Sequence, residues 1–250
     1  ALDYLVSPSN NYGKEALVKC LSFGTVGLTS IDRAFYNCSN LNELPSILYT
    51  GITSMENAVY GTTSLDDSNL VTWNTSNVTN IEGMFTNSDT FNQQLSAWSL
   101  FNVTSLDSVF ENASAFNSNV SLWNTSNVTS TRSTFRGATN FNQVVASWDM
   151  SRVTDMSYMF ANASNFNRDV SNWDVSNVLN MENMFLNANA LSLENQCQIH
   201  ESWSDQNDAW PYNWFGTCQP ELSEMPDTSI HEDHEYHLDL FDFSVFPTES

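Results

Sequence analysis

Bulky apolar residues recur along this chain at a fixed interval of 25 residues. Tryptophans mark the repeat at Trp73, Trp98, Trp123, Trp148 and Trp173. A phenylalanine follows twelve residues after each of them, at Phe85, Phe110, Phe135, Phe160 and Phe185. Nearer the N-terminus, Phe23 and Leu48 take the Trp position. Tyr60 takes the Phe position there, after a one-residue slip near Gly51. A constant period of this length indicates stacked repeats that bury their apolar edges against one another, and it predicts about seven of them over residues 23–190.

Asparagines repeat in the same frame and form three columns. The first column comprises Asn92, Asn117, Asn142 and Asn167. The second comprises Asn37, Asn87, Asn112, Asn162 and Asn187, with Thr62 and Gly137 interrupting it. The third comprises Asn77, Asn102, Asn127 and Asn177, with Arg152 interrupting it. An Asn amide both donates and accepts hydrogen bonds, so it can serve backbone groups that stacked coils leave unpaired. We therefore expect the first column to form an internal hydrogen-bond ladder, whereas the third column can instead face solvent.

Short motifs within one repeat predict its local structure. Segments such as "FNQQLSAW" have the character of short extended segments that end near the Trp. "SNVT" predicts a turn, because Ser and Asn side chains bond to nearby backbone groups. "NIEGMF", "DMSYMF" and "NMENMF" place apolar residues three and four apart, as one helical turn does. One repeat is thus expected to contain a strand, a bend, a helical turn and a return.

Charge and hydropathy narrow the possible partners. The formal net charge is −22, from 29 acidic against seven basic residues. Such a field repels nucleic acid and anionic lipid, so neither is expected as a partner. No apolar run is long enough to cross a bilayer, so membrane insertion is not expected either. The chain begins at Ala1 rather than Met, which fits removal of a signal peptide, although a trimmed sequence would begin in the same way.

The repeats resemble those of a known family. "FNQVVASWDMSRVTDMSYMFANASNFN" is similar to the repeat of bacterial and algal surface proteins that form a divergent branch of the BspA-like leucine-rich repeats. "IDRAFYNCSNLNELP" resembles the ordinary BspA-like unit more closely still. This resemblance implies an α/β solenoid, a leucine-rich-repeat-like right-handed coil of short parallel strands and short helical turns, capped at both ends. It also implies display outside the cell for adhesion or structure, with no shared catalytic residues.

The ends of the chain depart from the repeat. We expect an N-terminal cap at residues 1–22 and a Trp-rich C-terminal cap at residues 191–219, because a stack of repeats needs its terminal coils covered. The C-terminal cap would bring Trp203, Trp210, Tyr212 and Trp214 over the last coil. Residues 220–250 form an acidic linker followed by a strand-like tail.

Both ends of the chain also carry alternating apolar residues. These are Leu2, Tyr4 and Val6 at one end, and Leu238, Leu240, Phe241, Phe243 and Val245 at the other. Such segments can add as strands to a neighbouring molecule, which makes these residues candidates for head-to-tail self-association. Packing within the chain is the alternative.

Four cysteines are compatible with two disulfides. The two ends of a seven-coil stack would lie roughly 30 Å apart, far beyond the ~6 Å that a disulfide spans between Cα atoms. The remaining pairings are Cys20 with Cys38 and Cys197 with Cys218. Cys38 could instead be a buried thiol, since its column otherwise holds Ala, Ser and Thr.

No arrangement of residues predicts catalysis, a cofactor or a metal. The four histidines, His200, His231, His234 and His237, all lie outside the repeats. The last three belong to "HEDHEYH", but a spacing of three puts successive side chains on opposite faces of a strand. Two pairs of acids, Glu82 with Asp107 and Asp149 with Asp174, could meet on neighbouring coils as a glycosidase requires. Solvated surface acids are the preferred interpretation.

Asn-x-Ser/Thr sequons are frequent. They occur at Asn37, Asn74, Asn77, Asn102, Asn112, Asn119, Asn124, Asn127 and Asn162. The repeat itself creates many of them, so their number is weak evidence for glycans. Those in the doubled "WNTSNVT" lie in a bend and are the better placed.

Together these patterns predict a secreted, non-enzymatic structural or adhesive protein that associates with copies of itself and, if its source is eukaryotic, carries N-linked glycans at several of these sequons. The alternative is a monomeric receptor module that binds a carbohydrate or a cell-surface protein.

Overall fold

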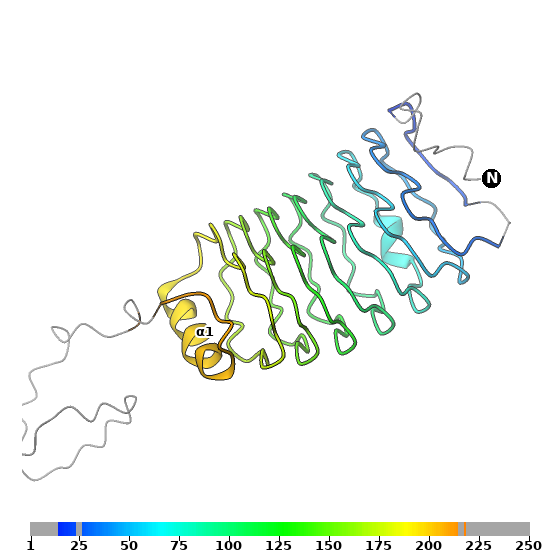
Figure 1. The fold of residues 1–250 in the computed structure, drawn as a ribbon. Coiled ribbons are helices and arrows are strands. Elements are labelled where there is room, and N and C mark those ends of the chain that lie inside the picture. Colours follow the sequence, from blue (N-terminus) through cyan, green and yellow to red (C-terminus); the bar gives the residue numbers. More distant parts are fainter. Residues whose placement is uncertain (1–14, 24–26, 215–217, 219–250) are drawn as a thin grey trace, which may run out of the picture. The chain divides into compact units, whose positions relative to one another are not determined.

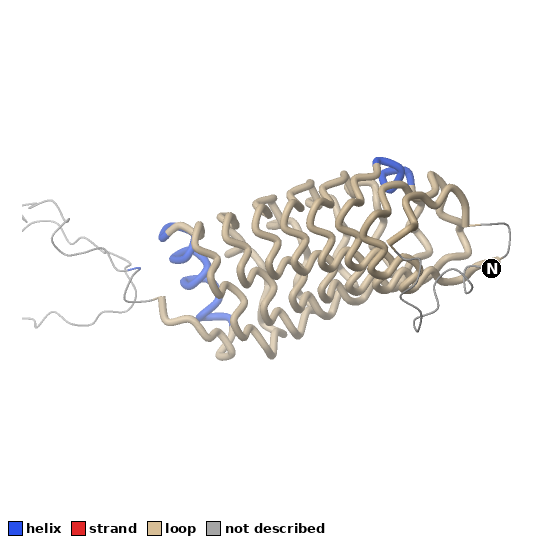
Figure 2. The backbone as a smooth tube through the Cα atoms, turned by 90° about the horizontal axis from the view of Figure 1, so that it is seen from above, coloured by secondary structure: helices blue, strands red, loops and turns tan. Residues whose placement is uncertain are grey.

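The structure, a computed structural model, describes residues 15–23, 27–214 and 218. They belong to the first of two compact units, Ala1–Cys218; the second is Gln219–Ser250. Within the first unit the backbone runs through successive coils that lie side by side in a row (Figure 1, Figure 2). The described residues include a 3-10 helix, η2 (Ser68–Thr72), and an α-helix, α1 (Leu193–Gln206). None of their helices is long and apolar enough to cross a membrane.

The predicted α/β solenoid of parallel strands and helical turns is wrong. In the described part of the chain no strand or sheet forms, and isolated parallel bridges join neighbouring coils instead. The bridges pair Lys19 with Glu43, Ser30 with Ser54, Ser54 with Asn80, Ser105 with Ser130, Ser130 with Asp155, and Asp155 with Asn180. The segments expected to be helical, such as "NIEGMF", are successions of turns. Coils of 24 to 26 residues therefore stack, but turns build them.

Left-handed backbone explains why these turns do not become helices. Two positions in each coil have φ between 51° and 69°. One column comprises Arg33, Asn57, Gly83, Ser108, Ser133, Tyr158 and Asn183, and the other comprises Asn37, Gly61, Asn87, Asn112, Gly137, Asn162 and Asn187. A helix needs consecutive right-handed residues, so a left-handed residue ends it. The second Asn column thus exists because Asn and Gly reach this conformation most easily, and Gly61, not Thr62, occupies its second position.

Backbone hydrogen bonds alternate between a coil and the next one. The N–H groups of Ser133 and Phe135 donate to Ser157 and Met159 of the following coil, both at 2.9 Å. The N–H of Arg136, the next residue after Phe135, instead donates to the carbonyl of Ser133 within the same coil, at 3.1 Å. Because every second N–H closes a local turn, no run of residues is extended for long enough to form a strand. This alternation accounts for the bridges without a sheet.

The early coils differ from the predicted register. Val59, 1% exposed, occupies the buried Phe position that was assigned to Tyr60. Its N–H donates to Met84, just as that of Phe85 donates to Val109 one coil later. The one-residue offset from the 25-residue spacing, which begins near Gly51, therefore also affects this turn. The 25-residue spacing returns only around η2.

Aromatic side chains fill the core in stacked columns. Successive Phe rings, such as Phe110 and Phe135, lie 5.7 Å apart at an interplanar angle of 4°. The Trp column is parallel to it, with 6.0 Å between the rings of Trp123 and Trp148. The Nε1 of Trp148 also donates to the carbonyl of Val120 at 3.1 Å, and the other indoles of the repeat, from Trp73 to Trp173, donate to the preceding coil in the same way.

Helix α1 and the segment after it cover the last coil. Ser192 caps α1, since its side chain accepts from the N–H of Asn195 at 3.3 Å. Trp203 on α1 is fully buried and stacks on Trp173 at 6.0 Å, which continues the Trp column by one position. Beyond the helix, Tyr212 accepts the N–H of Phe185 at 2.7 Å. Apolar and polar groups of the last coil are thus both covered.

Candidate interaction face

The left-handed turns present a row of aromatic and charged side chains on one side of the stack. We call this row the turn face; it comprises Arg33, Tyr36, Tyr60, Asn87, Glu111, Arg136, Tyr158, Glu182 and Asn183. Tyr36 and Tyr60 are stacked, with ring centroids 4.3 Å apart and planes at 9°. The guanidinium carbon of Arg33 lies 4.8 Å from the centroid of Tyr36. The Nδ2 of Asn87 donates to the Tyr60 hydroxyl at 2.7 Å.

The environment of Tyr60 keeps its phenol neutral. Burial raises the pKa of Tyr60, and the adjacent Tyr36 raises it further. Glu111 acts in the same direction, whereas the hydrogen bond from Asn87 lowers the pKa by a smaller amount. The raised pKa favours the neutral phenol, whose oxygen accepts the hydrogen bond from Asn87.

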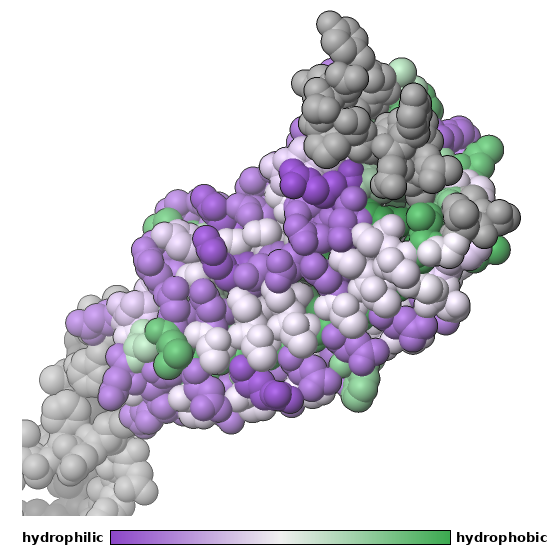
Figure 3. All heavy atoms as spheres, turned by 45° about the vertical axis from the view of Figure 1, so that its right-hand side comes forward, coloured by the Kyte–Doolittle hydropathy of each residue, from purple (hydrophilic) through white to green (hydrophobic). Residues whose placement is uncertain are grey.

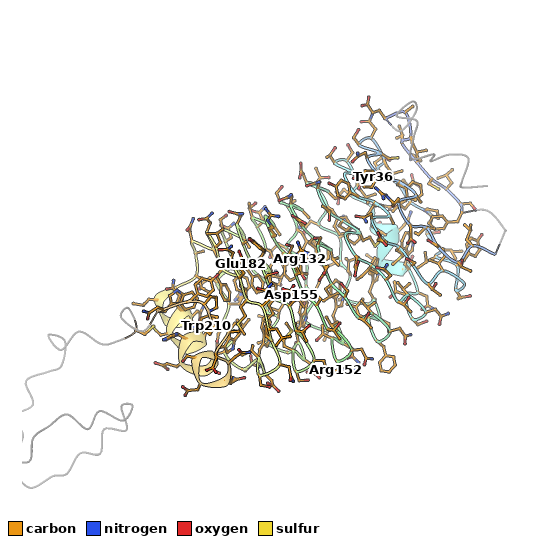
Figure 4. The ribbon with its side chains drawn as sticks, in the orientation of Figure 1. Tyr36, Arg132, Arg152, Asp155, Glu182 and Trp210 are labelled. Carbon is orange, nitrogen blue, oxygen red and sulfur yellow. A yellow bond between two sulfur atoms is a disulfide. The ribbon has the colours of Figure 1, made fainter. Side chains whose placement is uncertain are left out.

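The same row continues over the later coils. Arg136 Nη1 lies 2.9 Å from Glu111 Oε1, and its guanidinium carbon lies 5.5 Å from the centroid of the Tyr158 ring. The Tyr158 hydroxyl donates to Glu182 Oε1 at 3.1 Å and accepts from Asn183 Nδ2 at 3.0 Å. An exposed ion pair contributes little to stability, but this one places the Arg136 guanidinium beside both Glu111 and the Tyr158 ring. Figure 4 labels Tyr36 and Glu182, which belong to the turn face, and shows Arg152 at another edge of the stack.

The predicted Asn ladder is present. The Oδ1 of Asn117 accepts the backbone N–H of Asn142 at 2.9 Å, and Asn142 in turn accepts that of Asn167 at 3.0 Å. The third column also ties coils together, although its side chains are mostly exposed. The Nδ2 of Asn102, for example, donates to the carbonyl of Ser76 at 2.8 Å. Both columns therefore join successive coils.

The structure contains one of the two expected disulfides. Cys197 and Cys218 are joined, with 5.2 Å between their Cα atoms. The predicted bond between Cys20 and Cys38 is wrong. Cys38 is buried in the small-residue column, 1% exposed, while the N–H of Cys20 donates to Glu43 at 2.8 Å. Cys20 therefore lies beside a later part of that coil, away from Cys38.

One member of each predicted acidic pair accepts hydrogen bonds from nearby residues. Asp107 accepts from Ser130 Oγ and from the N–H of Arg132. The Oδ1 of Asp174 accepts from the hydroxyl and the N–H of Ser176, which lower the pKa of Asp174. These bonds tie Asp107 to the next coil and hold Asp174 within its own bend.

The histidines likewise provide no site in the described residues. His200 Nδ1 accepts from Trp210 Nε1 at 2.9 Å inside the C-terminal cap. Within the part of the chain that the structure describes, no group of three or more His, Cys, Asp and Glu side chains could hold a metal ion. His231, His234 and His237 lie outside the described residues, so that cluster stays an untested motif.

The predicted glycosylation sites lie in the described part of the chain, whereas the predicted self-association residues do not. The sequon asparagines Asn37, Asn74, Asn77, Asn102, Asn112, Asn119, Asn124 and Asn162 are exposed, and Asn127 is partly buried. The self-association candidates Leu2, Tyr4, Val6, Leu238, Leu240, Phe241, Phe243 and Val245 lie outside the described residues. Glycosylation and self-association both stay predictions.

The turn face itself was missed from sequence. Tyr36 and Tyr60 are 24 residues apart, one short of the period, so they did not align as a column. The left-handed positions that carry the face have a usable signal, because Asn and Gly recur there. Exposed apolar side chains, by contrast, occur along the whole stack, since Leu21, Leu122 and Leu179 are 73%, 74% and 79% exposed, and Figure 3 shows hydrophobic residues at several separate places on the face that it draws.

Comparison with protein families identifies the chain. The family model described as "Mycoplasma protein of unknown function, DUF285" matches residues 29–131 and 104–220. Among curated proteins, no match to the chain was found. The two matched stretches overlap, and together they cover residues 29–220, well over half of the 250-residue sequence. The chain therefore belongs to the DUF285 family.

Proposed function

We propose that this chain is a non-catalytic adhesive repeat protein that acts outside the cell and binds a protein partner through the turn face. One observation carries the proposal: aromatic and charged side chains form a row across successive coils, and contacts between coils hold them in place. Tyr36 stacks on Tyr60, and Arg136 lies between Glu111 and Tyr158. Side chains that are fixed before binding lose less entropy when a partner arrives.

The chemistry of the row favours a protein over a carbohydrate. Tyr and Arg are enriched where proteins bind one another, and they supply most of the binding energy there. The Tyr36 ring is covered on one face by Tyr60, and Arg33 lies over it as well. Little aromatic face is left for a sugar ring to stack on. The alternating charges of Arg33, Glu111 and Arg136 would instead set the register of a charged polypeptide partner.

Other features support an extracellular location. The disulfide between Cys197 and Cys218 is of a kind that persists in oxidising compartments. The strong negative charge and the exposed sequons agree with secretion. The resemblance of the repeats to those of BspA-like surface proteins remains a hypothesis that points the same way.

The cap over the last coil argues against self-association by direct stacking of coils. A filament built by adding coil to coil would have to displace Trp203 from Trp173. It would also have to displace Asn207, whose Nδ2 donates to the carbonyls of Val175 and Val178 at 2.6 and 2.7 Å. Binding across the turn face needs neither change, so we place it first. Association through the terminal segments is the second proposal.

Binding of the labelled full chain to intact cells of its source tests the function. We expect saturable binding that falls at least tenfold in the Tyr36→Ala/Tyr60→Ala/Arg136→Ala variant. Arg152→Ala, at another edge of the stack, is the matched control and should bind as the wild type. Protease treatment of the cells should abolish binding, whereas loss only after glycosidase treatment would favour the carbohydrate alternative. Equal binding by both variants, or assembly into filaments that bind no cells, would refute the proposal.

A further inference from the structure

The nine sequon asparagines occupy three kinds of position in the coil. Asn74, Asn119 and Asn124 lie in bends next to the Trp or just before it. Asn77, Asn102 and Asn127 belong to the third Asn column. Asn37, Asn112 and Asn162 have left-handed backbone. The three groups differ in which atom of the side-chain amide is engaged, and glycosylation concerns only the Nδ2 atom.

In the first group the amide oxygen is bonded and the nitrogen is not. The Oδ1 atoms of Asn74, Asn119 and Asn124 accept the backbone N–H two residues later, at 3.1, 2.8 and 3.1 Å. That N–H belongs to the Ser that completes each sequon. All three side chains are exposed, and their Nδ2 atoms donate to no residue that the structure describes.

In the second group the nitrogen is bonded to the preceding coil. The Nδ2 atoms of Asn77, Asn102 and Asn127 donate to backbone carbonyls there, at 2.8, 2.8 and 2.7 Å. Asn127 is held at its other atom as well, because its Oδ1 accepts from Arg152 Nη1 at 3.1 Å. Each of these nitrogens therefore lies against backbone.

In the third group the amide lies between neighbouring coils. Asn112 Nδ2 donates to Asn87 at 2.9 Å, and Asn162 Oδ1 accepts from Asn187 at 2.8 Å. The Oδ1 of Asn37 is turned towards Gly61, where a β-carbon would lie only 2.3 Å away. The oxygens of Asn37 and Asn162 and the nitrogen of Asn112 therefore lie against a neighbouring coil.

We propose that Asn74, Asn119 and Asn124 are the sites at which the folded chain carries N-linked glycans. In the transfer, Nδ2 forms a bond to the anomeric carbon of a lipid-pyrophosphate-linked oligosaccharide. The bond from that carbon to the pyrophosphate oxygen breaks, the lipid pyrophosphate leaves with the electron pair, and Nδ2 gives up one proton. The inference rests on the proposed extracellular location, since only a chain that enters the secretory route meets this donor.

Folding selects among the sites even where transfer precedes it. A sugar on Asn77, Asn102 or Asn127 would be attached to a nitrogen that must approach a backbone carbonyl to 2.7–2.8 Å when the coil closes. The sugar crowds the backbone beside that carbonyl and hinders closure of the coil, so chains modified there should be retained or degraded. A sugar on Asn74, Asn119 or Asn124 extends into solvent and leaves the bond at Oδ1 intact.

Secretion of the full chain from a host that performs N-glycosylation tests the proposal. Enzymatic deglycosylation in heavy-oxygen water, followed by peptide mass spectrometry, measures occupancy at every sequon. The doubled "WNTSNVT" provides matched pairs, because each copy holds one site of the first group and one of the second. Asn77 and Asn127 have Thr at the third sequon position, whereas Asn74 and Asn124 have Ser. Thr sequons are generally the better acceptors of glycans. The local sequence therefore favours Asn77 and Asn127, whereas the structure favours Asn74 and Asn124.

We expect the secreted protein to be occupied at Asn74, Asn119 and Asn124, with the second group occupied only in the fraction that cells retain. Asn74→Gln and Asn124→Gln should each remove one glycan from the intact mass. Thr79→Val, which destroys the sequon of Asn77 but keeps its side chain, should remove none. A major occupancy at Asn77, Asn102 or Asn127 in secreted protein, or empty sites in the first group, would overturn the inference. Cell binding is measured separately on deglycosylated protein, so failure of the proposed function remains distinguishable.

Discussion

Gly137 provides a direct test of the left-handed turns, because both its backbone and its surroundings oppose a side chain. Its φ is 69°, and a β-carbon there would lie 2.3 Å from the Oδ1 of Asn112. Alanine at this position takes on about 1–2 kcal/mol of backbone strain. The Asn112 amide must also turn, which disturbs its 2.9 Å bond to Asn87. That bond contributes about 1 kcal/mol. We therefore expect Gly137→Ala to lower the free energy of unfolding by about 2–3 kcal/mol, a fall in Tm of roughly 5–10 °C.

Two further variants distinguish strain at the left-handed position from a general loss of stability on replacing glycine. Gly137→Asn introduces the residue that fills most of this column, and Asn adopts left-handed backbone more easily than Ala. Its β-carbon also displaces the Asn112 amide, but the new Nδ2 can donate to Asn112 as Asn112 donates to Asn87, so Gly137→Asn should stay within about 1 kcal/mol of the wild type. Gly27→Ala is the control, because a β-carbon there meets nothing within 4 Å. It should be neutral or stabilise by about 0.4–1 kcal/mol.

Thermal and urea unfolding of the full chain, followed by Trp fluorescence, ranks the variants. The reasoning predicts that Gly137→Ala is clearly the least stable. It is refuted if Gly137→Ala unfolds together with Gly27→Ala, because the left-handed turn would then impose no constraint. It is also refuted if Gly137→Asn is as unstable as Gly137→Ala, because the column would then not select Asn.

Three other perturbations address the ladder, the cap and the bends. Asn142→Ala removes an acceptor between coils and should cost about 1–3 kcal/mol in urea unfolding, whereas Asn142→Asp, which keeps an acceptor, should cost less. Replacing Cys197 and Cys218 by Ser opens a loop with a sequence separation of 21. It should lower stability by about 3 kcal/mol and expose α1 to limited proteolysis first; an unchanged cleavage order would contradict this. Hydrogen bonds from Ser176 lower the pKa of Asp174 below its ordinary 3.8. The stabilisation they bring is present above that ordinary value and is lost as pH falls through the lower folded-state pKa, so Asp174→Asn should flatten the acid limb of a Tm-against-pH curve.

The repeat predicted the neighbours of a residue well, because in a stack each side chain meets its equivalent one period later. Trp123 and Trp148 were expected to pack, and their rings lie 6.0 Å apart. The ladder through Asn117 and Asn142 was expected from the same frame, and it is present. The position of a residue within the repeat determines these contacts, whatever its backbone conformation. The contacts were therefore predicted correctly even though the predicted secondary structure was wrong.

Local conformation could not be predicted in the same way. Apolar spacing at three and four fits a helical turn, but it fits two tight turns joined by a left-handed residue equally well. The left-handed backbone of Gly83 and Asn87, with φ of 60° and 57°, produces the tight turns. The spacing of apolar residues carries no information about φ, so it could not predict them. Tyr60 was misassigned for a related reason, since a slip of one residue exchanges a buried position for an exposed one. The turn face was hidden by that slip.

The hydrogen-bond alternation explains how turns without a sheet can still hold side chains for recognition. The N–H of Ser133 and the N–H of Phe135 are fixed by the next coil, and that of Arg136 is fixed by its own coil. Every turn is therefore held from two sides by backbone groups, which do not depend on the side chain. Arg136 points outward from such a turn and is free to meet Glu111 and Tyr158. The side chains of the turn face can thus differ from coil to coil while the stack that carries them remains the same.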